Sequence, residues 1–468
     1  MTDRTLVSQT PEKINEEVTL AGWIANRRDH GKLIFLDLRD HTGLVQVVVN
    51  PKVSGEAHNI ANDLRNEFVV SIRGKVNKRP ENLVNDNLPT GTVEIEAIDI
   101  KLLNQAQTPP FELGDTLNVN EEMRMKYRYL DLRSLRMAKN LRLRHKVTTL
   151  VREYLNNQNF IEIETPLLTK TSPEGARDFL VPSRLQPGNF YALPQSPQQY
   201  KQLLMIAGFD RYYQIAKCLR DEDLRKDRQL EHTQIDMEMS FVTEEEVRQL
   251  VEGLMIHVVE SLGKKVLQKP FPVYTHEQAL KEFGSDKFDL RPDKEDKNTF
   301  AFAWVTDFPL LEWEEDEKKH TFAHNPFSAP KEKDVEKLLK GENLGSLRAQ
   351  QYDLVCNGLE IASGGVRISD PEVQRKIFEI MGLTPEQTEE RFGHLIHAYE
   401  YGAPPHAGIA PGLDRLVSLI AGEDDIREVI AFPVNSSGDT SVMDAPSPAS
   451  SRQLKELHLK LELPKQKE

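Results

Sequence analysis

The residues most suggestive of chemistry lie in the stretch 211–241, RYYQIAKCLRDEDLRKDRQLEHTQIDMEMSF. Its pattern predicts two strands joined by a charged loop, with Arg220 and Glu222 ending the first strand and Arg228 preceding the second. Side chains alternate along a strand, so every second residue of the second strand shares one face. That face carries His232, Gln234, Asp236 and Glu238. Such a polar row is either exposed to solvent or the floor of a binding site.

Two further stretches have the form of functional motifs. One is an expected helix and strand that end at Pro166, where FIEIETP alternates apolar and polar residues. The other is APPHAGIAPGLDRLVSLIAG, residues 403–422, whose glycine-rich strand leads into a helix with Arg415 near its start. The sequence contains no P-loop, so a bound nucleotide would be held in another way.

The composition bounds the class of protein that positions these motifs. The 468 residues predict two or three domains, and 38% hydrophobic with 29% charged residues indicates a globular core. Two distant cysteines, Cys218 and Cys356, exclude a disulfide scaffold and a cysteine zinc site. We expect a cytoplasmic protein with no membrane partner, because no apolar run approaches a membrane span and no signal peptide is evident. The net charge of −14 argues against indiscriminate nucleic-acid binding, and so against a DNA partner, while permitting a local basic patch.

Residues 1–104 predict a small β-barrel domain. Strands are predicted by short runs rich in β-branched residues at 18–28, 32–40, 44–50, 68–76 and 92–103. A helix is expected at 56–66, after the third strand. This order is typical of an oligonucleotide-binding (OB) fold, with another small barrel as the alternative.

The rest of the chain predicts a basic linker and a larger α+β domain. Residues 105–136 contain two prolines and then a dense run of lysine and arginine, which suggests contact with a phosphate backbone. In residues 137–468 helices and strands do not alternate regularly, so we expect a mostly antiparallel sheet flanked by helices. Strands are expected at 160–166, 190–196, 211–222, 229–242, 354–368 and 429–434. Helices are expected over 147–155, 196–208, 243–263, 371–382, 384–402 and 412–422, and from Gln453 onward.

The motifs together resemble the three signature motifs of class II aminoacyl-tRNA synthetases. The stretches NRRDHGKLIFLDLRD, TSPEGARDFLVPSR, FYALPQSPQQYKQLLMIAGFDRYYQI, HNPFSAP and IREVIAFPVN sharpen this to a resemblance to bacterial-type aspartyl-tRNA synthetases, from about Val18 to Ser447. These enzymes usually carry an extra domain between the second and third motifs. Here a short exposed loop near 288–299 stands in its place.

The resemblance implies a two-step reaction in which aspartate and ATP form aspartyl-adenylate, and aspartate then moves to a tRNA 3′ end. It assigns catalysis to Arg220, Glu222 and Arg415, with Arg220 on the α-phosphate and Glu222 on the adenine amino group. Arg228 and Arg415 would bind the outer phosphates and adenine, and His232 would stack on the base where many relatives have Phe.

The family pattern also implies a metal site and an amino-acid pocket. Asp353 and Glu360 would hold Mg²⁺ against the triphosphate, and Glu360 also belongs to the ATP site. Lys201 and Arg367 would clamp the substrate β-carboxylate, because two cations suit an acidic side chain. Of the remaining pocket residues that the resemblance names, Glu174 and Asp236 would meet the substrate ammonium with Gln198 hydrogen bonding nearby, and His324 would close over the substrate. Asn325 stands where relatives usually have a second His, so it is left out of the site.

The partners implied are tRNA-Asp and a second copy of the chain. Phe35, Gln46 and Glu94 match anticodon-binding positions, although Phe35 taken alone is equally compatible with a core residue. His30, in the expected loop 26–32, stands where relatives that charge tRNA-Asn as well often have His, so we expect dual specificity. A homodimer is expected through residues 147–166. The alternatives are a lysyl or asparaginyl synthetase, or an inactive tRNA-binding paralogue.

Overall fold

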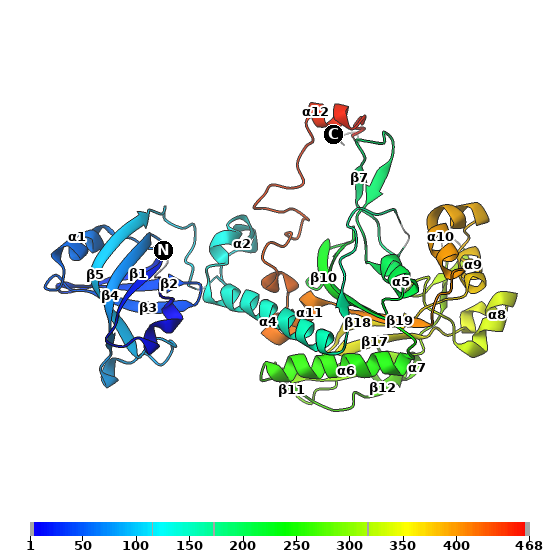
Figure 1. Cartoon of the computed structure of the whole chain (residues 1–468), viewed down its shortest axis with the longest axis horizontal. Coiled ribbons are helices and arrows are strands. Elements are labelled where there is room, and N and C mark those ends of the chain that lie inside the picture. The colour runs from blue at the N-terminus through cyan, green and yellow to red at the C-terminus, as the bar shows by residue number, and fades with distance from the viewer. Residues whose placement is uncertain (1–3, 115, 172–173, 316–317, 464–468) are drawn as a thin grey trace. The chain divides into compact units, whose positions relative to one another are not determined.

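The computed structural model describes residues 4–114, 116–171, 174–315 and 318–463. The chain divides into two compact units, Met1–Ala138 and Lys139–Glu468, drawn in Figure 1. Among the described residues, no helix is long and apolar enough to cross a membrane.

Within residues 4–114, five strands close into a barrel in the order β1-β2-β3-β5-β4. Alternation places Ile34, Leu36 and Leu38 of β2 in the barrel core and turns Phe35 outward. Helix α1 follows β3 and is capped by Ser54, whose side chain accepts a hydrogen bond from the Ala57 backbone amide. The expected OB fold is confirmed. The elements are β1 (Glu17–His30), β2 (Leu33–Asp40), β3 (Gly43–Val49), α1 (Gly55–Asp63), β4 (Val69–Lys78) and β5 (Val93–Asn104).

The hairpin between β1 and β2 corrects one expectation. The loop expected at 26–32 is shorter in the structure, because β1 continues past Arg28, where the expected strand ends, to His30, which pairs with Leu33. The turn is confined to Gly31 and Lys32, and Gly31 has a φ of +64° that favours glycine. His30 is therefore held in place by its pairing with β2 at the end of β1.

The basic stretch after β5 is more structured than a linker. It forms α2 (Glu121–Lys126) and α3 (Arg128–Asp131). Arg128 is buried and pairs with the buried Asp131 at 2.6 Å. Arg133 pairs with Glu67 at 2.9 Å and lies 5.1 Å from the Trp23 ring centroid. These two guanidinium groups therefore have partners within the first unit.

The described part of the second unit is built on an eight-stranded, mostly antiparallel sheet, ordered β12-β14-β17-β18-β19-β10-β9-β6. Only the outer strands β12 and β6 join it in parallel within this sheet. The expected α+β fold is confirmed. The strands are β6 (Ile161–Glu162), β9 (Arg211–Leu219), β10 (Glu231–Ser240), β12 (Val273–Thr275), β14 (Phe302–Thr306), β17 (Gln351–Cys356), β18 (Leu359–Val366) and β19 (His406–Pro411).

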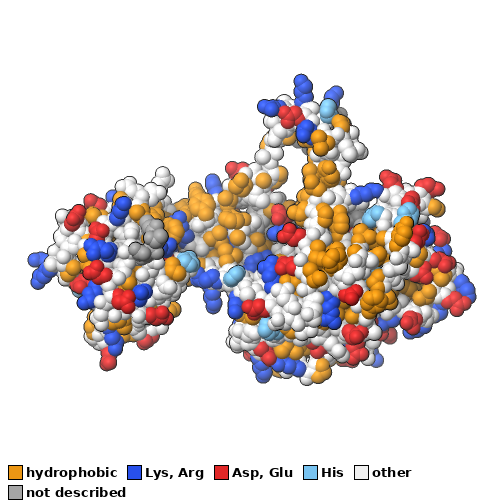
Figure 2. All heavy atoms as spheres, in the orientation of Figure 1, with side chains coloured by type: hydrophobic (Ala, Val, Ile, Leu, Met, Phe, Trp, Pro, Cys, Tyr) orange, Lys and Arg blue, Asp and Glu red, His pale blue; other side chains and the backbone are white. Residues whose placement is uncertain are grey.

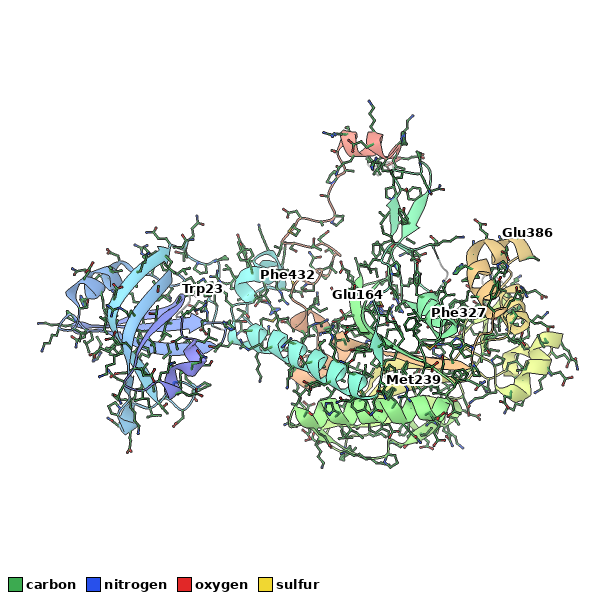
Figure 3. All side chains as sticks on the ribbon, in the orientation of Figure 1. Trp23, Glu164, Met239, Phe327, Glu386 and Phe432 are labelled. Atoms are coloured by element: carbon green, nitrogen blue, oxygen red, sulfur yellow. The ribbon has the colours of Figure 1, made fainter. Side chains whose placement is uncertain are left out.

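The main apolar core lies between this sheet and helices α4, α6 and α11 (Figure 1). Met239 of β10 lies between the sheet and α6 (Figure 3). Burial of this interface fixes the sheet, whose other side is free to carry polar groups. The helices are α4 (Leu135–Asn157), α5 (Gln198–Ile206), α6 (Glu244–Ser261), α7 (His276–Phe283), α8 (Val335–Lys340), α9 (Pro371–Ile380), α10 (Pro385–Tyr399), α11 (Leu413–Ala421) and α12 (Ser451–Glu456). Smaller strands are β7 (Leu180–Pro182), β8 (Phe190–Ala192), β11 (Lys265–Val266), β13 (Thr299–Phe300), β15 (Leu311–Glu314) and β16 (Lys319–Phe322).

Several local expectations were wrong. The single strand expected at 354–368 is divided between β17 and β18 by a turn at Asn357 and Gly358. The strand expected at 160–166 is ordered as a strand only at Ile161–Glu162. The strand expected at 429–434 is absent from the described structure there, where a 3-10 turn ends at Val429. The connection at 288–299 is not wholly exposed, because Phe288 is buried against Ala303 and Phe308, and the segment ends in β13.

Candidate active site

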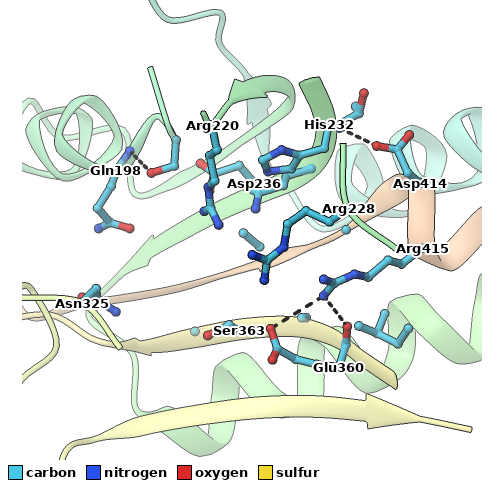
Figure 4. Close-up of a pocket in the computed structure, with 18 of the residues that line it drawn as sticks. Gln198, Arg220, Arg228, His232, Asp236, Asn325, Glu360, Ser363, Asp414 and Arg415 are labelled. Carbon is cyan, nitrogen blue, oxygen red and sulfur yellow. Dashed lines mark hydrogen bonds and ion pairs between the residues drawn. The ribbon is translucent and has the colours of Figure 1, made fainter. Parts of the chain in front are cut away.

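The predicted catalytic and binding side chains meet in one cavity of about 330 Å³ on the second unit (Figure 4). Strands β10, β18 and β19 contribute lining residues, Arg220 follows the end of β9, and α5 and α11 contribute from the sides. The predicted residues that line it are Glu174, Gln198, Lys201, Arg220, Glu222, Arg228, His232, Asp236, His324, Glu360, Arg367 and Arg415. The polar row on β10 is therefore the floor of a site and not a solvent-exposed face.

Three guanidinium groups face one part of this cavity (Figure 4). Arg228 pairs with Glu222 at 2.6 Å, and Arg415 donates to the Glu360 backbone carbonyl at 2.9 Å. In the described structure the buried Nε of Arg220 has no hydrogen-bond partner. A buried donor without a partner is costly, so this group suits an anionic ligand such as a phosphate.

His232 lies on β10 beside these cations. Burial, reinforced by Arg220 and Arg415, lowers the pKa of His232 to about 3. Its ring is therefore neutral at physiological pH, and a neutral imidazole next to three arginines is compatible with stacking on a base.

A buried cluster of charges closes the other end of the cavity. Lys201 Nζ lies 2.7 Å from Asp236 and 3.2 Å from Glu238. Arg367 reaches the Glu238 carboxylate through Nε at 2.9 Å and through Nη2 at 3.2 Å. All four side chains are at most 5% exposed. Two cations and two carboxylates thus balance in the absence of ligand.

The pKa values of the two acids differ. Burial alone would raise the pKa of Glu238, but Arg367 and Lys201 overcome burial and lower it. Burial dominates at Asp236 and raises its pKa against the attraction of Lys201. Glu238 was not among the predicted site residues, although it pairs with both Lys201 and Arg367. The period-two row on its strand placed it on the correct face, which was the available signal.

Glu174 and Gln198 flank this cluster. Ser196 donates a hydrogen bond to Glu174 at 2.8 Å, and Gln198 donates to Gln202 at 3.0 Å. Glu174 comes directly after residues 172–173 of the TSPEGAR loop, which lie outside the described residues. These two side chains are placed to meet a polar group above the clamp.

Asp353 lies beneath the cavity and not in its lining. It is 2% exposed and accepts a hydrogen bond from Gln351 at 3.1 Å. Burial and then the negative charge of Glu360 raise the pKa of Asp353 well above its ordinary value. No group of three or more metal-binding side chains is found in the described part of the chain. Two neighbouring carboxylates nevertheless fit Mg²⁺, which takes its other oxygens from phosphate and water.

The predicted anticodon residues share one outer face of the barrel. Phe35 is half-buried and points outward, so it is not part of the barrel core. The His30 and Phe35 rings meet edge to face with centroids 6.5 Å apart. Gln46 donates to Glu94 at 3.2 Å on the adjacent strands. An aromatic beside paired polar groups is suited to a nucleic-acid base.

Comparison with known proteins identifies the class. Residues 120–436 match the family model for class II tRNA synthetases of the D, K and N type, and residues 18–103 match the OB-fold nucleic acid binding domain. The fold and the site thus define a class II synthetase with an anticodon-binding type of barrel. The chain belongs to this family of class II tRNA synthetases, which use ATP as a substrate.

Curated relatives are similar over nearly the whole chain. The aspartate–tRNA(Asp/Asn) ligase of Geobacillus sp. is 41% identical, with 96% of each chain covered. That of Rubrobacter xylanophilus is 42% identical, with 96% of this chain and 95% of the relative covered. The first alignment runs over 574 positions, so that relative holds about a hundred residues or more that this 468-residue chain lacks.

Solved structures show the same fold. The asparaginyl-tRNA synthetase of Pyrococcus horikoshii superposes with a TM-score of 0.74 at 22% identity, covering 92% of this chain and 98% of that one. The aspartyl-tRNA synthetase of Entamoeba histolytica gives a TM-score of 0.72 at 22% identity, covering 92% and 91%.

Proposed function

We propose that the chain is an aspartate–tRNA ligase. The aspartate α-carboxylate attacks the α-phosphate of ATP, pyrophosphate leaves, and aspartyl-adenylate forms. The tRNA 3′-terminal hydroxyl then attacks the aspartyl carbonyl and AMP leaves. No enzyme nucleophile is required, so the protein acts by positioning and by stabilising charge.

The observation that carries this proposal is the buried clamp of Lys201 and Arg367. A lysine substrate would bring a third cation to the clamp. Lys201 and Arg367 present only N–H donors, so both oxygens of an aspartate β-carboxylate can accept from them, whereas the NH2 group of an asparagine amide would face them donor to donor. Asp236 and Glu238 keep both cations paired and fixed before substrate arrives, which preorganises the clamp.

The remaining residues then take roles in the two steps. Arg220 stabilises charge on the α-phosphate, and Arg228 and Arg415 bind the outer phosphates and adenine. Glu222 reads the adenine amino group and His232 stacks on the base. Glu174 and Gln198 bind the substrate ammonium, and His324 closes over the substrate.

Glu360 and Asp353 would hold Mg²⁺ in this proposal. The ion would supply positive charge that offsets the charge developing on the phosphates. Glu360 lines the cavity and would offer its carboxylate to the ion, and the buried Asp353, outside the lining, would add a second negative charge beside Glu360.

The barrel face with Phe35 and Gln46 binds the anticodon of tRNA-Asp. Since the curated relatives are named for both tRNAs, we propose that tRNA-Asn is charged as well, with His30 tolerating either third anticodon base through its donor and acceptor nitrogens. Measuring the rates of aspartylation of the two purified tRNAs tests this, and a large preference for tRNA-Asp contradicts it.

The working form is a homodimer. The second unit exposes large apolar side chains on and next to the β7–β8 hairpin, and the space-filling view shows hydrophobic side chains over this region (Figure 2). These are Leu167, Leu168, Leu180, Phe190 and Tyr191. Apolar exposure of this extent is typical of an interface. A monomeric mass in light scattering at micromolar concentration would contradict it. A cytoplasmic location stays a prediction from the sequence.

The activity is tested by ATP–pyrophosphate exchange with one amino acid at a time. Exchange dependent on aspartate, with asparagine and lysine near background, is expected. Exchange driven by asparagine or lysine would identify a sister synthetase, and no exchange with any amino acid would favour an inactive tRNA-binding paralogue.

A further inference from the structure

Lys287 is a cation of the cavity that the roles above leave without a function. It lies between α7 and β13, and its side chain lines the cavity. Its Nζ lies 3.0 Å from Glu360 Oε2, while 48% of its side chain is exposed. It is thus within reach of both a proposed metal ligand and solvent.

The backbone around Lys287 is fixed although its side chain is exposed. Phe288 is 6% exposed and packs in an apolar cluster with Ala303, Val305 and Phe308. The Gly358 amide, in the β17–β18 turn, donates to the Phe288 carbonyl at 3.1 Å. Phe288 therefore anchors the start of the connection at the rim, and Lys287 cannot drift away from the cavity.

The charges around Glu360 favour a shift of the Lys287 ammonium when a cation binds this carboxylate. Glu360 pairs with Lys287 on one oxygen, and its other oxygen lies 3.9 Å from Arg415. A divalent cation taking the same carboxylate would meet the ammonium as a like charge. A lysine ammonium on a flexible four-carbon stem can leave one anion for a neighbouring one, and phosphate oxygens are strong acceptors.

We propose that Lys287 is a phosphate-binding residue of this site, held by Glu360 in the free protein and transferred to the β- and γ-phosphates when nucleotide enters. It would then follow the same phosphates into pyrophosphate. This inference rests on the proposed function only in requiring a nucleoside triphosphate in the cavity. It does not depend on which amino acid is activated.

The test is nucleotide binding to the full chain by calorimetry, with Lys287→Met, Lys287→Arg and a matched control. The probes are the non-hydrolysable ATP analogue AMPPCP with Mg²⁺, and AMP. Lys287→Met should weaken AMPPCP binding by about ten- to a hundredfold, the effect of losing one charge-assisted contact, and leave AMP binding unchanged. Lys287→Arg should retain most of the affinity. Lys281→Met, which removes an exposed lysine of nearby α7, should bind both probes as the unmodified protein does.

Lys287→Met should also reach half-maximal AMPPCP binding at a lower Mg²⁺ concentration, because the competing ammonium is gone from Glu360. Unchanged AMPPCP affinity in Lys287→Met, or an equal loss for AMP and AMPPCP, would overturn the proposal. Failure of the proposed function would appear elsewhere, as missing aspartate dependence in the exchange reaction of the unmodified chain.

Discussion

Substituting Glu238 by Gln should destabilise the protein more than substituting Asp236 by Asn. Both changes remove one negative charge from the buried clamp and preserve side-chain shape. Glu238 holds Arg367 through two hydrogen bonds and lies 3.2 Å from Lys201. Asp236 pairs with Lys201 alone, at 2.7 Å. Removing Glu238 therefore disturbs both cations, and removing Asp236 disturbs one.

The size of the effect follows from burial. Breaking a buried ion pair by removing one partner costs about 3–5 kcal/mol, because a charge is left without a counter-charge. We assign about 5 kcal/mol to Glu238→Gln and about 3 kcal/mol to Asp236→Asn. Each kcal/mol lowers the melting temperature of a unit of this size by about 2 °C, so the expected losses are about 10 °C and 6 °C.

The assay is thermal unfolding of the intact chain, paired with aspartate-dependent pyrophosphate exchange. Glu231→Gln is the control, because Glu231 lies on the same strand with 62% of its side chain exposed and a loose 3.7 Å pair to Lys217. It should change the melting temperature by about 1 °C or less. The Michaelis constant for aspartate should rise about tenfold or more in Glu238→Gln, since Arg367 loses its anchor. A melting temperature of Glu238→Gln within 1 °C of the unmodified protein, or a larger loss in Asp236→Asn, would show that Glu238 is not the counter-charge shared by Arg367 and Lys201.

Three further outcomes are expected. Arg220→Ala should lower adenylate formation by about 10²–10³ with tRNA binding nearly intact, and an equal loss of both would indicate a folding defect instead. His232→Phe should be less sensitive to acid: the pKa of His232 is about 3 when folded and near 6.5 when unfolded, so the unfolded chain gains a proton as the pH falls below 6.5. From pH 7 to 5 the unmodified protein should lose about 1–2 kcal/mol of unfolding free energy more than His232→Phe. Urea unfolding at both pH values measures this, and an equal loss in the two proteins would contradict it. His30→Leu should slow charging of tRNA-Asn while sparing tRNA-Asp, and equal slowing of both would show that His30 does not discriminate.

The sequence predicts a strand most reliably where apolar and polar residues alternate with a clear period of two. Alternation predicted the strand at 32–40 and put the polar row of β10 on one face, because a strand with one buried face must repeat every second residue. It left open whether that row faces solvent or a site, and whether Phe35 is a core residue. Phe302–Thr306 was not predicted as the strand β14, since all five residues are buried and no alternation exists to detect. The strand expected at 429–434 is absent, because the short apolar run there does not pair with another described strand.

The residue types and the family pattern predicted most residues of the site, but they did not predict which of these residues pair with one another. The family pattern brought Lys201 and Arg367 together, but it could not assign Glu238 to Arg367, because these two residues are 129 positions apart in the chain. The same holds for Lys287 and Glu360. Such contacts depend on the order of the strands in the sheet and on the conformations of the side chains. The local periodicity of the sequence specifies neither of these.

The most direct test of the central claim is transfer of labelled aspartate to a purified tRNA-Asp by the 468-residue chain with ATP and Mg²⁺. Aspartyl-tRNA that requires ATP and is lost in Arg367→Leu is expected, because the catalytic motifs lie on both sides of the short connection at 288–299 and none lies within it. Adenylate formation without any charged tRNA would show that the missing residues are needed for transfer. Charging with asparagine or lysine in place of aspartate would rule out an aspartate–tRNA ligase.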